Sequence, residues 1–170
     1  GDDLILKRMK RRHSRAQAVE TVQRLKAARP DVALGAALIA GFPTEDDAAA
    51  ANSLALIDDC DISLAHVFPY SPRPGTPAAR MPQLDRALVK ERAGRLRETG
   101  KRLHEAHLQS MIGRTETILV ENNGLAHTEN FTRVDAGGLK PRALVPVTIT
   151  GHNGRHLTMR PLPAAAASRN

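Results

Sequence analysis

Residues 32–41, with the sequence VALGAALIAG, are the segment that indicates the fold class most directly. The run is short, contains no polar side chain and ends at Gly41. A short, uninterrupted apolar run of this kind is typical of a strand that is buried on both faces of a parallel sheet. Residues 62–68 predict a second buried strand.

Residues 1–13 are basic, and we expect them to be irregular. Helical patterns then precede and separate the two strands. Ser14 and Gln17 match a capping box that opens the first helix, and Pro30 closes it. Thr44 is the expected cap of the second helix, with Glu45, Asp46 and Asp47 in its first turn, where the helix dipole favours carboxylates. The residues expected on its inward face are Ala48, Ala51, Leu54, Ala55 and Ile57. Helix, strand, helix and strand with short connections indicate βα units.

The second half of the chain has a different pattern of apolar and turn residues. Residues 84–112 form a long helical pattern that Gly113 ends. From Thr115 the apolar period shortens toward two, and Asn123-Gly124 and His152-Asn153-Gly154 mark tight turns. The expected short strands are 115–121, 125–128, 131–135, 143–150 and 156–160. About fifty residues of such strands predict a small, closed or nearly closed antiparallel barrel.

We therefore expect an α/β chain made of βα units, a long connecting helix and a small antiparallel β-barrel. The expected boundaries are 1–82 for the βα units, 83–113 for the helix, 114–162 for the barrel and 163–170 for a disordered tail.

The composition restricts the partners. The formal net charge is +7 and the isoelectric point is near 10.3, which favours a polyanion, nucleic acid first, although a surplus for solubility is the alternative. No apolar run is long enough to cross a membrane, so we expect no membrane partner and a cytoplasmic protein. Cys60, the single cysteine, forms no internal disulfide and no cysteine metal site alone, so we expect a buried small hydrophobe and no metal site. Because the chain starts Gly-Asp-Asp, we infer that an amino-terminal part is missing.

Three sequence segments contain candidate functional residues, and we call them, in chain order, the first, second and third phrase. Residues 7–15, KRMKRRHSR, hold six cations and no acid, which indicates either an anion site or a solvated charge run. Residues 38–45, LIAGFPTE, place Gly41 at a strand end, where a ligand can approach the backbone, or where the chain only turns. Residues 66–78, HVFPYSPRPGTPA, form a stiff loop suited to holding a substrate near a barrel mouth. Its Arg73 is either a pre-ordered ligand or a surface arginine. For His66, a satisfied core histidine is favoured over a catalytic one.

Together the phrases resemble the radical S-adenosylmethionine methylthiotransferases that modify tRNA, best the branch acting on threonylcarbamoyladenosine. Residues 1–14 match a loop near that family's cofactor and substrate pocket. Residues 70–78 match a loop beside its active-site opening, and residues 38–45 match a strand end of its cofactor cleft. At Ala37 the family usually has aspartate, so the chain departs there. The resemblance implies no catalytic residue in the chain. The implied cofactor-binding residues are Arg11, Ile39, Gly41 and Glu45. The implied substrate-proximal residues are Met9, His13, Tyr70, Ser71, Arg73 and Thr76.

The barrel resembles the family's TRAM domain, an OB-like module that binds tRNA. The residues expected to contact RNA are Arg114, Arg133, Lys140, Arg142 and Arg155, with Arg160 as a further candidate. Phe131 is the one aromatic side chain there, and we expect it in the core. Recognition by charge and shape is then favoured over stacking of bases.

The resemblance implies that the complete enzyme converts N6-threonylcarbamoyladenosine beside the anticodon to its 2-methylthio derivative, with S-adenosylmethionine and two [4Fe-4S] clusters. Such clusters need several cysteine thiolates, and this chain has one cysteine, so we expect it to be inactive alone. Its partners would be tRNA and the amino-terminal part of the same polypeptide. The alternatives are an RNA-binding module without catalysis, or a sister enzyme acting on isopentenyladenosine in tRNA or on a ribosomal protein.

Overall fold

The computed structural model describes residues 1–163. The chain divides into two compact units, with the boundary between His104 and Glu105. Apart from Pro163, the expected carboxy-terminal tail lies outside the described residues. Among the described residues, no helix is long and apolar enough to cross a membrane.

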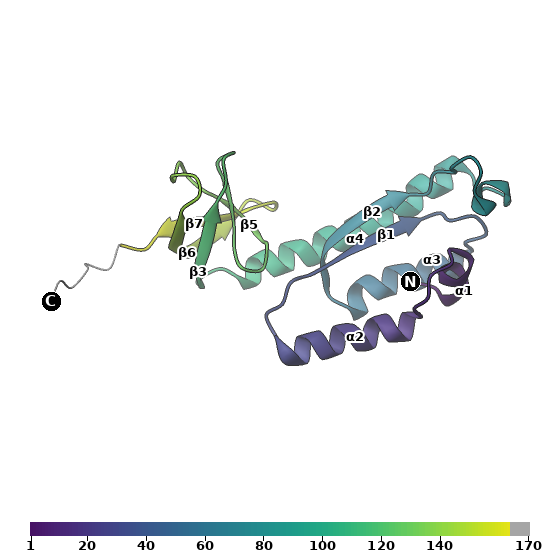
Figure 1. Ribbon diagram of the computed structural model, residues 1–170, viewed down its shortest axis with the longest axis horizontal. Coiled ribbons are helices and arrows are strands. Elements are labelled where there is room, and N and C mark those ends of the chain that lie inside the picture. The colour runs from purple at the N-terminus through teal and green to yellow at the C-terminus, as the bar shows by residue number, and fades with distance from the viewer. Residues whose placement is uncertain (164–170) are drawn as a thin grey trace. The chain divides into compact units, whose positions relative to one another are not determined.

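The first unit is built from βα segments, as expected. In chain order it contains α1 (Asp3–Arg8), α2 (Arg15–Ala28), β1 (Leu34–Ala40), α3 (Asp47–Asp59), β2 (Ile62–Pro69), the short 3-10 helix η1 (Pro77–Arg80) and most of α4 (Arg86–Ser110). Strands β1 and β2 lie side by side and pair in parallel, with Leu38 opposite Val67 (Figure 1). The expected capping box of α2 is present, because Ser14 and Gln17 bond to each other's backbone N–H.

Three local expectations in this unit are wrong. Residues 1–13 are not irregular throughout, because Asp2 caps α1 by accepting the Ile5 N–H. Thr44 has a φ of 70° and does not cap α3; Asp46 does so by accepting the Ala49 N–H, so Glu45 precedes the helix. The inward face is also shifted: Ala48, Ala51 and Ala55 are exposed, whereas the buried residues of α3 are Ala49, Ala50, Ser53 and Ile57.

Both strands bury one face rather than two. The core of the unit joins residues of β1, α3, β2 and α4, namely Leu38, Ala40, Ile57, Cys60, Ile62, Ala93 and Leu96. Ala37 and His66 are register partners on the opposite face, and both are exposed. His66 is therefore not a core histidine, because strand alternation points it away from the packed helices. Cys60 is 2% exposed and is the buried small hydrophobe expected from the sequence.

Helix α4 lies close to β2 at a glycine. A Cβ atom added at Gly100 would come within 2.6 Å of the Ala65 Cβ. Gly100 thus lowers the helix propensity of α4 but allows the helix to pack closely against β2. The helix begins at Arg86, after the Asp85 side chain has accepted the Ala87 N–H.

The second unit is the expected closed barrel. Its strands are β3 (Thr115–Val120), β4 (Leu125–His127), β5 (Arg133–Asp135), β6 (Leu144–His152) and β7 (Leu157–Pro161), in the spatial order β3-β4-β5-β7-β6. Leu108 of α4 and Met111, which directly follows the helix, join its core. One pair, β5 with β7, is parallel, so the barrel is antiparallel except at this seam.

The expected burial of Phe131 is wrong. Its side chain is 76% exposed. Phe131 has a φ of 59°, and its N–H donates to the Thr128 carbonyl in the turn between β4 and β5. This left-handed turn directs the ring away from the barrel interior, which Ala126 and Val134 fill from either side.

Candidate functional site

The three phrases converge where β1 and β2 end. A small apolar cluster centred on Ile5 and Phe42 receives Met9 from the first phrase and Tyr70 and Ala78 from the third. The Phe42 and Tyr70 rings meet edge to face with their centroids 5.3 Å apart. Segments some thirty residues apart in sequence thus meet, because the carboxyl ends of parallel strands lie on the same edge of a sheet. We call the region around this cluster, at the carboxyl ends of β1 and β2, the mouth.

Further polar contacts link the phrases. The Arg8 guanidinium donates to the Thr44 hydroxyl, which joins the first phrase to the second. The Tyr70 N–H donates to the Ala40 carbonyl at 2.8 Å, which joins the third phrase to the end of β1. The mouth is therefore held by packing and by hydrogen bonds from different segments.

Gly41 is required by two features of its surroundings. Its φ is 74°, in the left-handed region that favours glycine. A Cβ atom at this position would also come within 2.6 Å of the Val89 side chain on α4. Its N–H donates to the Glu45 Oε1 at 3.1 Å. The backbone conformation and the packing of the protein therefore require a glycine at position 41, with or without a bound ligand.

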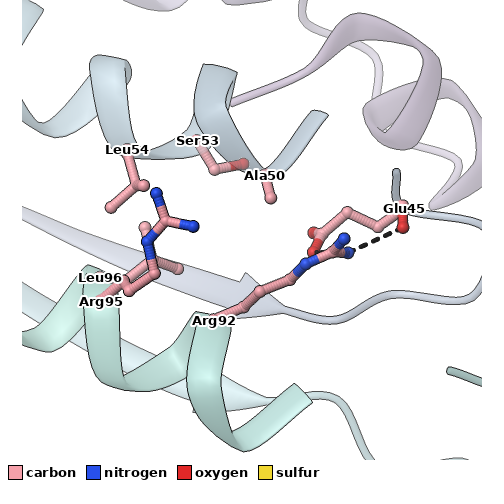
Figure 2. A pocket seen from close by; sticks show the side chains of 7 residues that line it. All are labelled: Glu45, Ala50, Ser53, Leu54, Arg92, Arg95 and Leu96. Atoms are coloured by element: carbon pink, nitrogen blue, oxygen red, sulfur yellow. Dashed lines mark hydrogen bonds and ion pairs between the residues drawn. The ribbon is translucent and has the colours of Figure 1, made fainter. Parts of the chain in front are cut away.

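Glu45 is held in a buried ion pair with Arg92 of α4. Arg92 Nη1 donates to Glu45 Oε1 at 3.0 Å and to the Glu45 carbonyl at 2.8 Å, and its Nη2 donates to Asp47 Oδ1 at 2.6 Å. Figure 2 shows Arg92 reaching from α4 toward Glu45. The two paired side chains are 6% and 3% exposed. Burial raises the pKa of the Glu45 carboxyl above its ordinary value and outweighs the hydrogen bonds from Gly41 and Arg92, which act in the opposite direction.

The space around this ion pair is too small for a cofactor. The cavity drawn in Figure 2 has a volume of about 10 Å³, roughly that of one water probe. Glu45 fixes the turn after β1 to α4 and shapes the mouth. Arg92 was not predicted from the sequence, since nothing distinguishes it there from the other cations of the helix.

A second cavity beside the mouth is large enough for a ligand. Its volume is about 620 Å³, and it is lined by the ends of both strands and by the first half of α4. It brings together Gly41, Tyr70 and Ser71, three of the residues predicted from the sequence. Among its lining residues none is acidic, and three are cations on α4: Arg86, Lys90 and Arg97.

These three cations were missed at the sequence level, although a signal for two of them was present. Arg86 and Lys90 are four residues apart, a spacing that places both on one helix face. Arg97 is tied to the protein, because its Nη2 donates to the Val67 carbonyl at 3.3 Å. The cavity combines positive charge with the Tyr70 and Ser71 side chains, which suits an anionic ligand with further polar groups.

The other predicted residues lie outside this cavity lining. Arg11, His13 and Arg73 are exposed. Thr76 donates to the Arg73 carbonyl at 2.8 Å and accepts the Ala79 N–H, so it caps η1. Ile39 lies on the open face of the sheet, opposite Phe68 in the register. Their proposed roles remain predictions.

The predicted RNA-contacting residues are all exposed on the barrel unit: Arg114, Arg133, Lys140, Arg142, Arg155 and Arg160. Arg142 also borders an open hollow of about 370 Å³ beside Glu121 and the 122–123 turn. Residues 105–163 contain these six cations and five carboxylates. The barrel unit is therefore only weakly basic, and most of the chain's positive charge belongs to the first unit.

The described residues do not fit the ligation of an iron–sulfur cluster. Cys60 is buried, and burial raises the pKa of its thiol, which disfavours the thiolate that a cluster needs. In residues 1–163 no three His, Cys, Asp or Glu side chains are grouped as metal ligands.

Comparison with known proteins gives relatives but no family model that matches. The chain is 52% identical over 134 residues to the threonylcarbamoyladenosine tRNA methylthiotransferase MtaB of Rickettsia prowazekii, which covers 79% of the chain and 32% of that protein. It is 34% identical over 175 residues to the tRNA-2-methylthio-N(6)-dimethylallyladenosine synthase of Sphingopyxis alaskensis, covering 98% of the chain and 39% of that protein. A synthase of the same name from a Parafrankia strain is 35% identical over 162 residues, covering 95% of the chain and 33% of that protein.

The chain thus spans between 32% and 39% of the length of these curated relatives. The matched part of the Rickettsia protein is its carboxy-terminal third. The βα units, the long helix and the closed barrel agree with the architecture that the resemblance implied. The chain belongs to the family of tRNA methylthiotransferases and is homologous to their carboxy-terminal region.

Proposed function

We propose that the chain is the substrate-binding and tRNA-binding part of an enzyme that converts N6-threonylcarbamoyladenosine beside the anticodon to its 2-methylthio derivative. The observation that carries the proposal is the 52% identity to a protein named for threonylcarbamoyladenosine, against 34% to 40% for the relatives named for dimethylallyladenosine. The work would be done in the cytoplasm, where such a tRNA is found.

We assign residues 1–82 to the end of the catalytic barrel, 83–113 to the connecting helix and 114–162 to the TRAM domain. In the complete enzyme, bound S-adenosylmethionine and two [4Fe-4S] clusters would supply the radical and the sulfur. This chain would contribute no cluster ligand, because its single cysteine is buried. Its own task is to bind and orient.

The first unit would hold the modified nucleoside and its neighbours. Ile39 and Gly41, with Arg11 from the first phrase, would border the cofactor, and the buried Glu45–Arg92 pair would keep the turn after β1 in place. Tyr70, Ser71, Arg73 and Thr76, with Met9 and His13, would lie beside the substrate. Arg86 and Lys90 in the large cavity would neutralise phosphate or carboxylate groups of the bound RNA.

The test uses the complete gene. A strain lacking it is complemented with the wild-type gene, and tRNA nucleosides are quantified by mass spectrometry. Restoration of 2-methylthio-N6-threonylcarbamoyladenosine supports the proposal. If the restored nucleoside is instead a 2-methylthio derivative of dimethylallyladenosine, the second candidate function, suggested by the other two relatives, replaces it. If no tRNA nucleoside changes, the chain's catalytic assignment is wrong.

A complementary test uses the 170-residue chain alone. Purified and reconstituted with iron and sulfide, it is expected to show no reductive cleavage of S-adenosylmethionine, because the cysteine thiolates are lacking. Cleavage by this chain would contradict the assignment of its residues to binding.

A further inference from the structure

Four strands of the barrel align a row of side chains on its outer surface. Leu144 of β6 is the register partner of Leu119 of β3, Leu119 is also the partner of His127 of β4, and His127 is the partner of Arg133 of β5. Cross-strand partners point to the same face of a sheet. Leu144, Leu119 and Arg133 are exposed, so this face is the outside of the barrel. We call these four residues, together with Phe131, the outer row.

Phe131 lies beside His127 of this row, in the turn between β4 and β5. Its ring centroid is 6.3 Å from that of His127, with the rings tilted by 52°. The ring is 76% exposed, although Phe131 is one of only three phenylalanines in the chain. Leu144 and Leu119 are 71% and 49% exposed. The row is thus a line of apolar and aromatic groups that ends at a cation.

The exposure of Phe131 is imposed by its turn. The Phe131 N–H donates to the Thr128 carbonyl, and Thr128 and Thr132 exchange hydrogen bonds through the Thr128 N–H and hydroxyl. Thr132 is itself 2% exposed and bonds through its hydroxyl to His107 at 2.9 Å. A left-handed φ at a phenylalanine is costly, and backbone strain of this kind is often kept where it serves a function.

We propose that the outer row is a stacking platform for unpaired bases of the tRNA anticodon loop. Phe131 and His127 would each offer a ring face to a base, Arg133 would contact the adjoining phosphate, and Leu119 and Leu144 would cover sugar and base edges. This inference rests on the proposed function, since it deepens how the same unit binds tRNA. It reverses the expectation that charge and shape alone provide recognition.

The aromatic rings of the outer row, not the net charge of the barrel unit, indicate RNA as the occupant. With six cations against five carboxylates in residues 105–163, the barrel unit gains little attraction for a polyanion from net charge. Stacking on aromatic side chains supplies affinity that does not depend on charge and tolerates any base. The Glu121 carboxylate lies 3.1 Å from the His127 Nδ1. Arg133 can then meet a phosphate at one end of the row.

The test measures binding of the full-length enzyme to a fluorescent anticodon stem-loop across a salt series. Phe131→Leu removes the ring face but keeps an apolar side chain, and we expect affinity about 10-fold lower at every salt concentration, with an unchanged slope against salt. Phe131→Trp should restore binding. Ile112→Ala, which trims another exposed apolar residue of the same unit outside the row, should bind as the wild type does.

Each result decides something. If Phe131→Leu binds as tightly as the wild type, or if tryptophan fails to restore a loss seen with leucine, the platform is wrong. If RNA binding is unchanged but the variant alters the oligomeric state by light scattering, the row contacts protein instead and the proposal also fails. Nucleoside analysis of the complemented strain distinguishes failure of the platform from failure of the proposed function. If the wild-type gene restores the modified nucleoside but Phe131→Leu binds RNA normally, only the platform is rejected. If the wild-type gene restores no modified nucleoside, the proposed function is rejected.

Discussion

The mouth of the first unit and the outer row of the second unit use their notable residues in opposite ways. At the mouth, polar side chains of the three phrases bond to other groups of the protein. Glu45 pairs with Arg92, Thr44 bonds to Arg8, and Thr76 caps η1. On the outer row, Phe131, Leu119 and Leu144 extend into solvent. The contrast teaches that a motif residue can serve a site by holding its shape, whereas an unremarkable one can offer the surface that a partner contacts.

The largest test of this contrast removes the buried ion pair at the mouth. Arg92→Ala would leave the Glu45 carboxylate buried without its cation, and we expect a loss of about 3 to 5 kcal/mol in the free energy of unfolding of the first unit. Denaturant unfolding measures it. Replacing both partners together, Arg92→Met with Glu45→Leu, should cost clearly less than Arg92→Ala. Equal costs would show that the pair is not coupled.

The next test concerns Gly41 and has a matched control in the same unit. Gly41→Ala meets both a φ of 74° and the Val89 side chain, so we expect it to cost about 2 to 4 kcal/mol. Gly75→Ala has a φ of 83° but no atom within 4 Å of the new Cβ, so it should cost only about 1 to 2 kcal/mol. Thermal unfolding of the two variants gives the difference. A smaller loss at Gly41 than at Gly75 would contradict the packing argument.

The cations of the large cavity give a test on binding rather than stability. Arg86→Ala and Lys90→Ala should each weaken tRNA binding several-fold and lower the dependence of log affinity on log salt by about one. This is the opposite of the behaviour expected for Phe131→Leu, whose salt slope should not change. Arg24→Ala, an exposed cation of α2 outside the cavity, is the control. An unchanged slope in the Arg86 and Lys90 variants would exclude direct phosphate contacts there.

Two glycines of α4 sharpen the role of close packing. Gly94→Ala has open space around the new Cβ and should stabilise the helix by up to about 1 kcal/mol. Gly100→Ala places its Cβ 2.6 Å from the Ala65 Cβ, so the clash should exceed the same propensity gain and lower the melting temperature. A Gly100→Ala variant that melts at a higher temperature than the wild type would show that Gly100 is not a packing glycine.

The smallest expected effect is a pH dependence. The folded pKa of Glu45 is raised by burial above its ordinary 4.5, so the folded state holds the proton more tightly than the unfolded chain. The contribution of Glu45 to stability is therefore greatest below pH 4.5 and declines as pH rises through the folded pKa. Glu45→Gln removes this decline, so the stability of the wild type relative to the variant should fall with rising pH between those limits. Chemical unfolding at several pH values measures it, and a rising difference would reverse the assigned sign.

Local signals in the sequence predicted local structure well. The capping box of Ser14 and Gln17, the Asn123-Gly124 turn and the two apolar runs each specify backbone geometry through neighbouring residues. Their physical origin is short-range, so no distant partner was needed to recognise them. The placement of α3 failed by a few residues because Thr44 and Asp46 are both capping residue types, and the contact from Arg8, 36 residues away in the sequence, engages Thr44.

Burial and partnership were decided by the tertiary structure. The order of the elements, the family resemblance and the gathering of candidate residues in three phrases could all be read from the amino-acid sequence. Three features are visible only in the folded chain: Glu45 pairs with Arg92, Arg86 and Lys90 line one cavity with Tyr70, and Phe131 is exposed. The reason is that exposure and ion pairing depend on which distant elements pack together, and neither composition nor spacing along the chain carries that information.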